Sequence, residues 1–278
     1  IPVAAGVSAN FVKDLIVLPY NTQSSLDYIS DNADRIAGVF CEAIQNRNPH
    51  VHPRKFLQRL RDMTTASNIV LVFDEVVTGF RVGAGGVQAH LGIRADLACY
   101  GKAIAGGMVV GAVAGSDECM NGVDGGRWQY GDRTFPKGHR TYFAGTFCKH
   151  PLGMAAVNAC LDEMIENGDE FYPRLKAYTD YMASVLNPYW KSKGVGISMN
   201  HFGSQFRFTV PPDLALTFYQ LLKLNGVYTW ESRTCFQYTT TTTEDIEAVI
   251  AAFKKTTEQL MDAGIRFPPV EETPPKVH

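Results

Sequence analysis

The sequence predicts an α/β protein: a large domain built on a mostly parallel sheet, followed by a small α+β C-terminal domain. Short apolar runs alternate with helical patterns over the first hundred residues. The run NIVLVFD at 68–74 is apolar almost throughout, as a strand covered on both faces requires. From residue 151 the pattern changes to long helices followed by short strands. The predicted boundaries are 1–155 for the large domain, 156–267 for the small domain and 268–278 for a proline-rich tail or linker.

Apolar runs and helical periodicity define the elements of the large domain. Strands are predicted at 14–19, 37–42, 68–74, 97–100 and 110–115. Helices are predicted at 24–35 and 53–67. Pro53 suits the first position of a helix, and Leu57 and Leu60 recur behind it on one face. Strand–helix–strand order predicts parallel pairing.

The small domain mixes longer helices with short strands. Helices are predicted at 151–167, 172–191 and 243–261. Strands are predicted at 196–200, 205–210, 227–229 and 234–238. Thr243 begins the last helix, with Asp245 and Glu247 in its first turn, where carboxylates are favourable.

Composition excludes several classes of protein. The 278 residues include 26 Lys and Arg against 28 Asp and Glu, so no basic excess favours nucleic acid. No apolar run approaches the ~20 residues that span a membrane, and the first residues do not resemble a signal peptide. Six cysteines are scattered without a C-x-x-C, which predicts a cytoplasmic protein. His50 and His52 lack further ligands at metal spacing, so we expect no metal site.

Asp74 is the first residue that suggests chemistry. It ends the apolar run at 68–74, and the carboxyl ends of parallel strands are where α/β sheets bind ligands. The carboxylate has two other interpretations. It is a cap for the following turn, or it is the magnesium-binding acid of a P-loop nucleotide hydrolase. The second needs G-x-x-x-x-G-K-[ST], which the printed sequence lacks.

Lys102 lies between two apolar stretches, with no acidic neighbour adjacent in sequence. Such a lysine is either a surface residue or a buried amine. Burial disfavours the charged form, so a buried amine has a lowered pKa and is a nucleophile able to form a Schiff base.

Gly145 and Thr146 stand just before the helix predicted from residue 151. A hydroxyl and backbone N–H groups near a helix start suit a phosphate, although a helix cap is the commoner role. Asp74, Lys102 and this Gly-Thr pair together fit pyridoxal 5'-phosphate (PLP). That cofactor needs an acid for its ring nitrogen, a lysine for its aldehyde and donors for its phosphate.

Four segments of the chain resemble class III (fold type I) PLP-dependent aminotransferases. The first is FDEVVTGFRVGAGGVQAHLGIRADLACYGKAIAGGMVVGAVAG at 73–115, which is similar to the cofactor core of the glutamate-1-semialdehyde aminomutase branch. The others are GGRWQYGD, TYFAGTFCKHPLGMAA and GVYTWESRTCF. These three resemble the aminotransferase domains of polyketide and nonribosomal peptide synthases. The similarity runs from about residue 14 to residue 267.

The resemblance implies a role for each cofactor-binding residue. Asp74 would pair with the pyridine nitrogen, and Val76 would pack on one face of the ring. Lys102 would bind the cofactor covalently and move the proton during transfer. Gly145 and Thr146 would bind the phosphate in the neighbouring subunit, which implies a homodimer.

The substrate residues implied by the resemblance are Glu42, Trp230, Glu231 and Arg233. Ala43 follows Glu42 where the family usually has Pro. The family's N-terminal portion, which supplies a Gly/Ser-rich phosphate turn and a ring-stacking aromatic, is absent from the sequence. We therefore expect an excised, cleaved or incomplete piece of a longer enzyme.

The resemblance implies an aminotransferase that takes the amino group of an amino-acid donor. We expect the acceptor to be a β-ketoacyl group carried by an acyl carrier protein of a synthase. The alternative is a glutamate-1-semialdehyde 2,1-aminomutase. An alternative of another class is a non-catalytic dimerisation or scaffold fragment. No nucleic-acid or membrane partner is expected.

Overall fold

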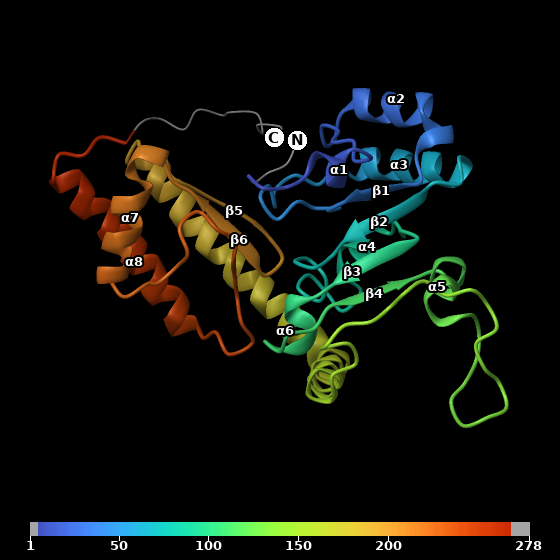
Figure 1. Ribbon diagram of the computed structural model, residues 1–278. Helices are drawn as coiled ribbons and strands as arrows, with labels where there is room; N and C mark the ends of the chain where they lie inside the picture. The colour runs from blue at the N-terminus through green and yellow to red at the C-terminus, as the bar shows by residue number, and fades with distance from the viewer. Residues whose placement is uncertain (1–4, 268–278) are drawn as a thin grey trace.

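Two separate β-sheets organise the chain (Figure 1). The computed structural model describes residues 5–267, and the predicted tail at 268–278 lies outside the described residues. The large sheet contains β1 (Gly38–Cys41), β2 (Val70–Asp74), β3 (Leu97–Tyr100) and β4 (Ala112–Gly115), in that order. The small sheet contains β5 (Ser198–Phe202), β6 (Gln205–Thr209) and β7 (Cys235–Phe236), also in chain order.

The large sheet is mostly parallel, as the sequence predicts. Strands β1, β2 and β3 run in the same direction, and β4 returns antiparallel to β3. Cys41 pairs with Phe73, and Asp74 pairs with Cys99. The carboxyl ends of the three parallel strands therefore meet at one edge of the sheet, which we call the carboxyl edge.

Short helical segments precede, connect and follow the strands of the large sheet. They are α1 (Ala9–Val12), α2 (Gln23–Asp31), η1 (Ala33–Arg35), α3 (Arg54–Ala66), α4 (Gly86–Leu91), η2 (Lys102–Ala105) and α5 (Asp117–Asp124). Helix α3 buries Leu57 and Leu60, the apolar positions that predict it. Helices α4 and α5 were not predicted; they are short and lie in the glycine-rich middle of the chain.

The strand predicted at 14–19 is wrong, because this segment joins neither sheet. Leu15 and Val17 are 65% and 70% exposed. An apolar run becomes a strand only where a neighbouring strand completes its hydrogen bonds and an apolar layer covers it. Neither condition holds here.

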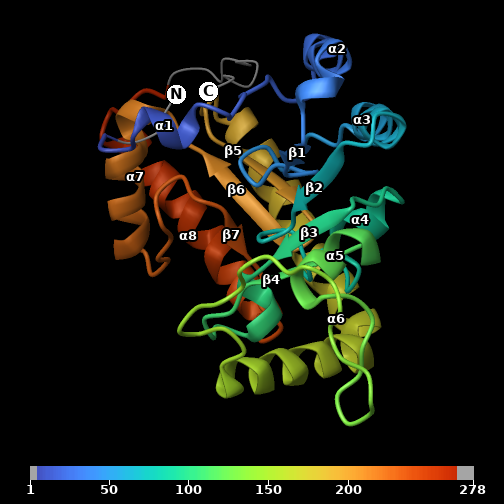
Figure 2. The ribbon, with the colours of Figure 1, turned by 45° about the vertical axis from the view of Figure 1, so that its right-hand side comes forward.

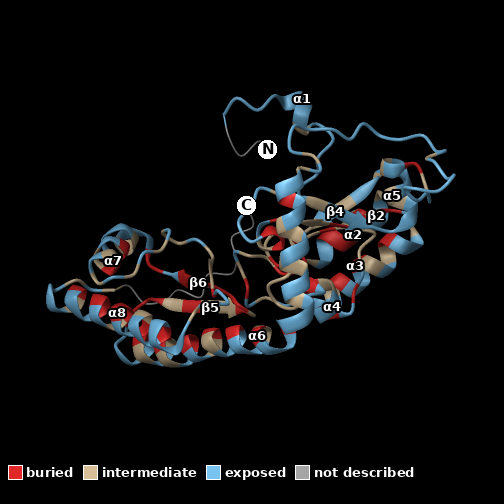
Figure 3. Ribbon diagram, turned by 90° about the horizontal axis from the view of Figure 1, so that it is seen from below, coloured by how far each residue is buried: buried red, intermediate tan, exposed pale blue. Residues whose placement is uncertain are grey.

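A single helix, α6 (Pro151–Ser192), replaces the two helices predicted at 151–167 and 172–191. It passes from the large sheet to the small sheet and bends on the way (Figures 2 and 3). Pro173 lies inside it and removes one backbone N–H from the helical ladder, which accounts for the bend. None of the helices between residues 5 and 267 is both long and apolar enough to cross a membrane.

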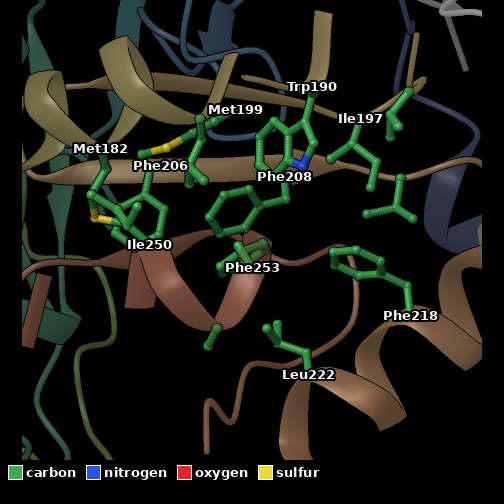
Figure 4. Close-up of a cluster of buried hydrophobic side chains, with 14 of the residues drawn as sticks. Met182, Trp190, Ile197, Met199, Phe206, Phe208, Phe218, Leu222, Ile250 and Phe253 are labelled. Atoms are coloured by element: carbon green, nitrogen blue, oxygen red, sulfur yellow. The ribbon is translucent and has the colours of Figure 1, made fainter. Parts of the chain in front are cut away.

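The small sheet packs against α6, α7 (Pro212–Leu224) and α8 (Thr243–Asp262). Its core is aromatic, with Phe208 and Phe253 at a ring-centroid distance of 4.2 Å beside the buried Trp190 (Figure 4). Helix α7 was not predicted. The strand predicted at 227–229 is wrong, because the N–H of Val227 donates to the carbonyl of Leu222 and so ends α7.

A second hydrophobic core lies beneath the large sheet and α3, and it contains the buried Leu71 and Phe73. Phe202, at the end of β5, completes this core from the other half of the chain. Its ring lies 4.7 Å from that of His52 and 5.0 Å from that of His90. The domain division at residues 155 and 156 stays a prediction, because α6 continues through it.

Candidate active site

Asp74 ends β2 at the carboxyl edge, as predicted, and is half-buried. Its Oδ1 accepts a hydrogen bond of 2.9 Å from the N–H of Val76, so the capping interpretation holds for this oxygen. The other carboxylate oxygen accepts no hydrogen bond from residues 5–267. Burial, and then the negative charge of Asp74, raise the pKa of Cys99 on the adjacent strand. One carboxylate oxygen therefore remains able to bind a ligand beside β3.

Lys102 begins η2, three residues after Cys99 on β3. Its φ of 49° lies in the left-handed region, which non-glycine residues adopt only where the surroundings impose it. A Cβ added at Gly101 would meet Cγ1 of Val76 at 3.3 Å, so Val76 packs against the turn that carries Lys102. The sequence predicts either a surface lysine or a buried amine at this position. In the single chain the Lys102 side chain is exposed, which agrees with the surface lysine.

Glu75 was not identified in the sequence analysis, although it follows Asp74 directly. Its side chain is completely buried and accepts hydrogen bonds from the N–H groups of Val87 at 2.8 Å and Gln88 at 3.1 Å. Gly86 has a φ of 62°, and a Cβ there would collide with the Glu75 carboxylate. Glu75 thus fixes α4 against the turn after Asp74. The paired acids in LVFDE were the only sequence signal for it.

Glu42 follows β1 at the same carboxyl edge. Its Oε2 accepts hydrogen bonds from the backbone N–H of Asn46 at 2.8 Å and from the Asn46 side chain at 2.7 Å. Burial, and then the charge of Glu42, raise the pKa of Cys41 to about 12. The structure gives Glu42 a role in shaping the loop at 42–46, and its substrate role stays a prediction.

The segment at 230–234 approaches this loop from the small sheet. The hydroxyl of Thr234 donates to the carbonyl of Asn46 at 3.0 Å. The guanidinium of Arg233 lies 4.9 Å from the ring centroid of Trp230, which is 67% exposed. Glu231 forms an ion pair of 3.8 Å with Lys223. The structure therefore joins this segment to the loop that Glu42 shapes through Thr234, while Glu231 pairs with a residue of α7.

Gly145 and Thr146 are not joined to Asp74 or Lys102 by any hydrogen bond within the described part of the chain. Both are exposed and lie on the connection at 125–150, which projects from the molecule between α5 and α6 (Figure 1). Aromatic side chains on this connection are also exposed, among them Tyr130 at 93% and Tyr142 at 92%.

The residues of the carboxyl edge fit PLP in their chemistry. A carboxylate with a free oxygen suits the protonated ring nitrogen, and an accessible amine suits the aldehyde. Gly101 leaves room for Val76 beside the lysine turn. The predicted phosphate donors Gly145 and Thr146 lie on the exposed connection between α5 and α6 instead.

The chain is similar to aminotransferases and to a related aminomutase. The family model for class III aminotransferases matches residues 11–256. The glutamate-1-semialdehyde 2,1-aminomutase of Psychrobacter arcticus is 37% identical over 207 residues, which are 74% of this chain and 45% of that protein.

Two solved structures share the fold. A transaminase with PLP bound superposes with a TM-score of 0.82 at 26% identity and covers 94% of this chain. The ω-transaminase from Sphaerobacter thermophilus superposes with a TM-score of 0.80 at 26% identity and covers 92% of this chain. This chain spans about 60% of each of those structures and about half of the aminomutase. The fold is that of the fold type I PLP-dependent transferases, and the chain belongs to the class III aminotransferase family.

Proposed function

We propose that this chain carries the reactive lysine and the ring-nitrogen acid of an enzyme that uses PLP to transfer an amino group. The observation that supports this function is the placement of Asp74 and Lys102. They follow neighbouring parallel strands at one edge of the sheet, and Val76 packs between the two segments. Membership of the family favours this function over the scaffold alternative.

Asp74 would hold the proton on the ring nitrogen of the cofactor through its free carboxylate oxygen. PLP, when bound, supplies a ring that accepts electrons from the substrate carbon. Lys102 would bind the cofactor through Nζ and then use the same atom to accept the α-proton of the amino donor. The exposed position of Nζ leaves it accessible for both tasks.

The phosphate site would require a second copy of the chain. Gly145 and Thr146 are exposed on the projecting connection, so they are free to donate to the cofactor of a partner subunit. The exposed Tyr130 and Tyr142 supply apolar surface for such a contact. These observations support a homodimer with shared sites.

A cytosolic setting agrees with the cysteines. All six are free thiols, and none is fully exposed. Disulfides form and persist mainly in secreted proteins and are rare in the cytosol. We therefore propose that the enzyme acts in a reducing compartment.

Two substrates are candidates, and different observations support them. The relative from Psychrobacter arcticus favours a glutamate-1-semialdehyde 2,1-aminomutase, which would isomerise a free γ-semialdehyde. The segments at 125–132 and 226–236 resemble synthase aminotransferases and favour a carrier-bound β-ketoacyl acceptor. The comparisons support the aminomutase more strongly.

Borohydride reduction tests the central assignment. The protein loaded with PLP is reduced, digested and mapped by peptide mass. The cofactor should remain attached to Lys102 and to no other lysine. A label on another lysine, or cofactor binding without any label, would reject the proposed function.

Measuring turnover of each substrate separates the two candidate functions. Amino transfer is measured with glutamate-1-semialdehyde and with a β-ketoacyl thioester on an acyl carrier protein. Efficient turnover of the semialdehyde alone would establish the aminomutase. Efficient turnover of the carrier-bound thioester alone would establish the synthase enzyme.

A further inference from the structure

The segment at 78–82, which we call the interface loop, follows Asp74 and Glu75 and lies between the two sheets. The N–H of Gly79 donates to the carbonyl of Glu75 at 2.8 Å, and the N–H of Arg81 donates to the carbonyl of Thr78 at 3.2 Å. Thr78 and Gly79 are buried. The interface loop is therefore a compact turn that continues directly from the buried Glu75.

The small sheet holds the far end of the interface loop. The hydroxyl of Ser204, in the turn between β5 and β6, donates to the carbonyl of Arg81 at 3.0 Å. The guanidinium of Arg81 lies 3.7 Å from the ring centroid of Phe236 on β7. A Cβ added at Gly203 would come within 2.7 Å of the Val82 side chain, so the two backbones approach closely. Contacts from two strands and a turn thus fix this end of the loop.

Helix α6 holds the middle of the interface loop. The hydroxyl of Tyr172 donates to the carbonyl of Phe80 at 3.2 Å. Burial raises the pKa of Tyr172 to about 12, so the hydroxyl keeps its proton at neutral pH. Phe80 has a φ of 61°, in the left-handed region that a bulky residue adopts only where the surroundings impose it. The contacts from the other half of the chain therefore determine the backbone of this loop.

The interface loop also packs against the strand that leads to Lys102. The ring of Phe80 lies 5.3 Å from the ring of Tyr100, measured between centroids. A Cβ added at Gly79 would meet Cδ1 of Tyr100 at 2.7 Å, so the loop backbone lies directly on this ring. Tyr100 ends β3 and stands two positions before Lys102, whose own φ of 49° is left-handed. One chain of contacts therefore runs from the small sheet to the reactive lysine of the proposed function.

We propose that the interface loop couples the small sheet to the turn at 101–106, the Lys102 turn, and that Arg81 and Tyr172 are positioning residues for this lysine. A shift of the small sheet would move Arg81 through its stacking contact with Phe236. The close contact of the loop with Tyr100 would pass that shift to Lys102, because close-packed side chains transmit displacements. The effect on amino transfer rests on the proposed function, whereas the coupling itself does not.

Hydrogen exchange at the Lys102 turn tests the coupling in the protein without PLP. Tyr172→Phe removes one hydrogen bond to the interface loop and keeps the ring. We expect exchange at the Lys102 turn to become about threefold to tenfold faster, as the loss of one such bond allows. Tyr181→Phe is the matched control, because it removes the bond from another α6 hydroxyl to Glu247. It should leave exchange at the Lys102 turn as in the wild type.

Variants of Arg81 test its positioning role. Arg81→Gln removes the cation from the ring of Phe236, and Arg81→Lys keeps a cation without the planar guanidinium. In the protein loaded with PLP, we expect Arg81→Gln to lower kcat for amino transfer by about 10–100-fold with KM nearly unchanged, as for a small misplacement of a reacting group. Arg81→Lys should lie between Arg81→Gln and the wild type. Arg59→Gln, on the exposed face of α3, should match the wild type.

The outcomes distinguish the coupling from a general loss of stability. Faster exchange confined to the interface loop and the Lys102 turn supports the coupling. Unchanged exchange at the Lys102 turn in Tyr172→Phe, or an equal rise throughout the large sheet, overturns it. Tyr172→Phe decides the matter alone if Arg81→Gln does not fold. Borohydride labelling of Lys102 is measured separately, so the coupling and the proposed function can fail independently.

Discussion

The two sheets of the molecule differ in how completely they are covered. The small sheet closes on an aromatic core in which Trp190 and Phe253 are fully buried. The large sheet buries Phe73 on one face but leaves Phe40 of β1 61% exposed and Val113 of β4 54% exposed. The predicted reactive residues, Asp74 and Lys102, lie at the edge of the open large sheet. The difference teaches that, under the proposed function, the chemistry belongs to the half whose sheet is less completely covered, although that half has a core of its own.

Replacing Lys102 should have the largest effect on activity. Lys102→Ala removes the amine that would bind the cofactor and move the proton. We expect amino transfer to fall by about 10³-fold or more, within the range for a lost general base. The measurement is the transfer rate with saturating PLP. Lys55→Ala, on the exposed face of α3, should keep the wild-type rate. Equal rates in both variants would place the chemistry elsewhere.

Asp74→Asn should have the next largest effect. The amide cannot hold the proton of the ring nitrogen by ion pairing, so charge at the substrate carbon is less stabilised. We expect a loss of at least ~10²-fold in rate with some cofactor retained, as for a major electrostatic interaction. Cofactor absorbance and transfer rate are measured together, with Asp62→Asn on α3 as control. A near-wild-type rate would leave Asp74 only its capping role.

Substitutions of two phenylalanines compare how much packing in the small sheet and on the large sheet stabilises the fold. Phe253 contacts the rings of Phe208 and Trp190, so Phe253→Ala should lower the free energy of unfolding by about 3–5 kcal/mol. Phe40→Ala, at an exposed ring on β1, should change it by less than about 0.5 kcal/mol. Denaturant unfolding of both variants measures the difference. A large loss in Phe40→Ala would show that the large sheet is covered in solution.

The smallest effect is expected where the two halves touch. The hydroxyl of Ser204 donates to the carbonyl of Arg81 at 3.0 Å, and Ser204 is only 3% exposed. Ser204→Ala should lower the free energy of unfolding by about 0.5–1.5 kcal/mol. Ser184→Ala removes a similar bond within α6, where the hydroxyl is exposed, and should cost less. Equal losses would mean that the contact between the halves adds no stability.

Local signals explain which elements the sequence predicts. The apolar run ending at Asp74 forms a central parallel strand, because continuous apolar character suits burial on both faces. The similar run at 14–19 has no neighbouring strand, and no property of its own residues reveals this. Helix α7 was not predicted, although it begins at Pro212 with Asp213 in its first turn, and both residues are recognisable signals for the start of a helix.

In the candidate site, too, some features are predictable from the sequence and others are not. Asp74 and Lys102 are predictable because each follows a strand whose direction the sequence indicates. The contact between Thr234 and Asn46 joins residues 188 positions apart and brings the segment at 230–234 to the loop after β1. Such a contact depends on the register of β6 and β7, which an isolated strand pattern does not specify.

The position of Phe202 has a consequence for the order in which the chain is made. The rest of the core beneath the large sheet comes from residues before 96, yet Phe202 fills the space between His52 and His90. At about 5–20 residues per second, the ribosome adds Phe202 roughly 5–20 s after the rest of that core. Until β5 emerges, the first half of the nascent chain therefore lacks the ring that covers this part of its core, so this core is completed only after most of the chain has been made.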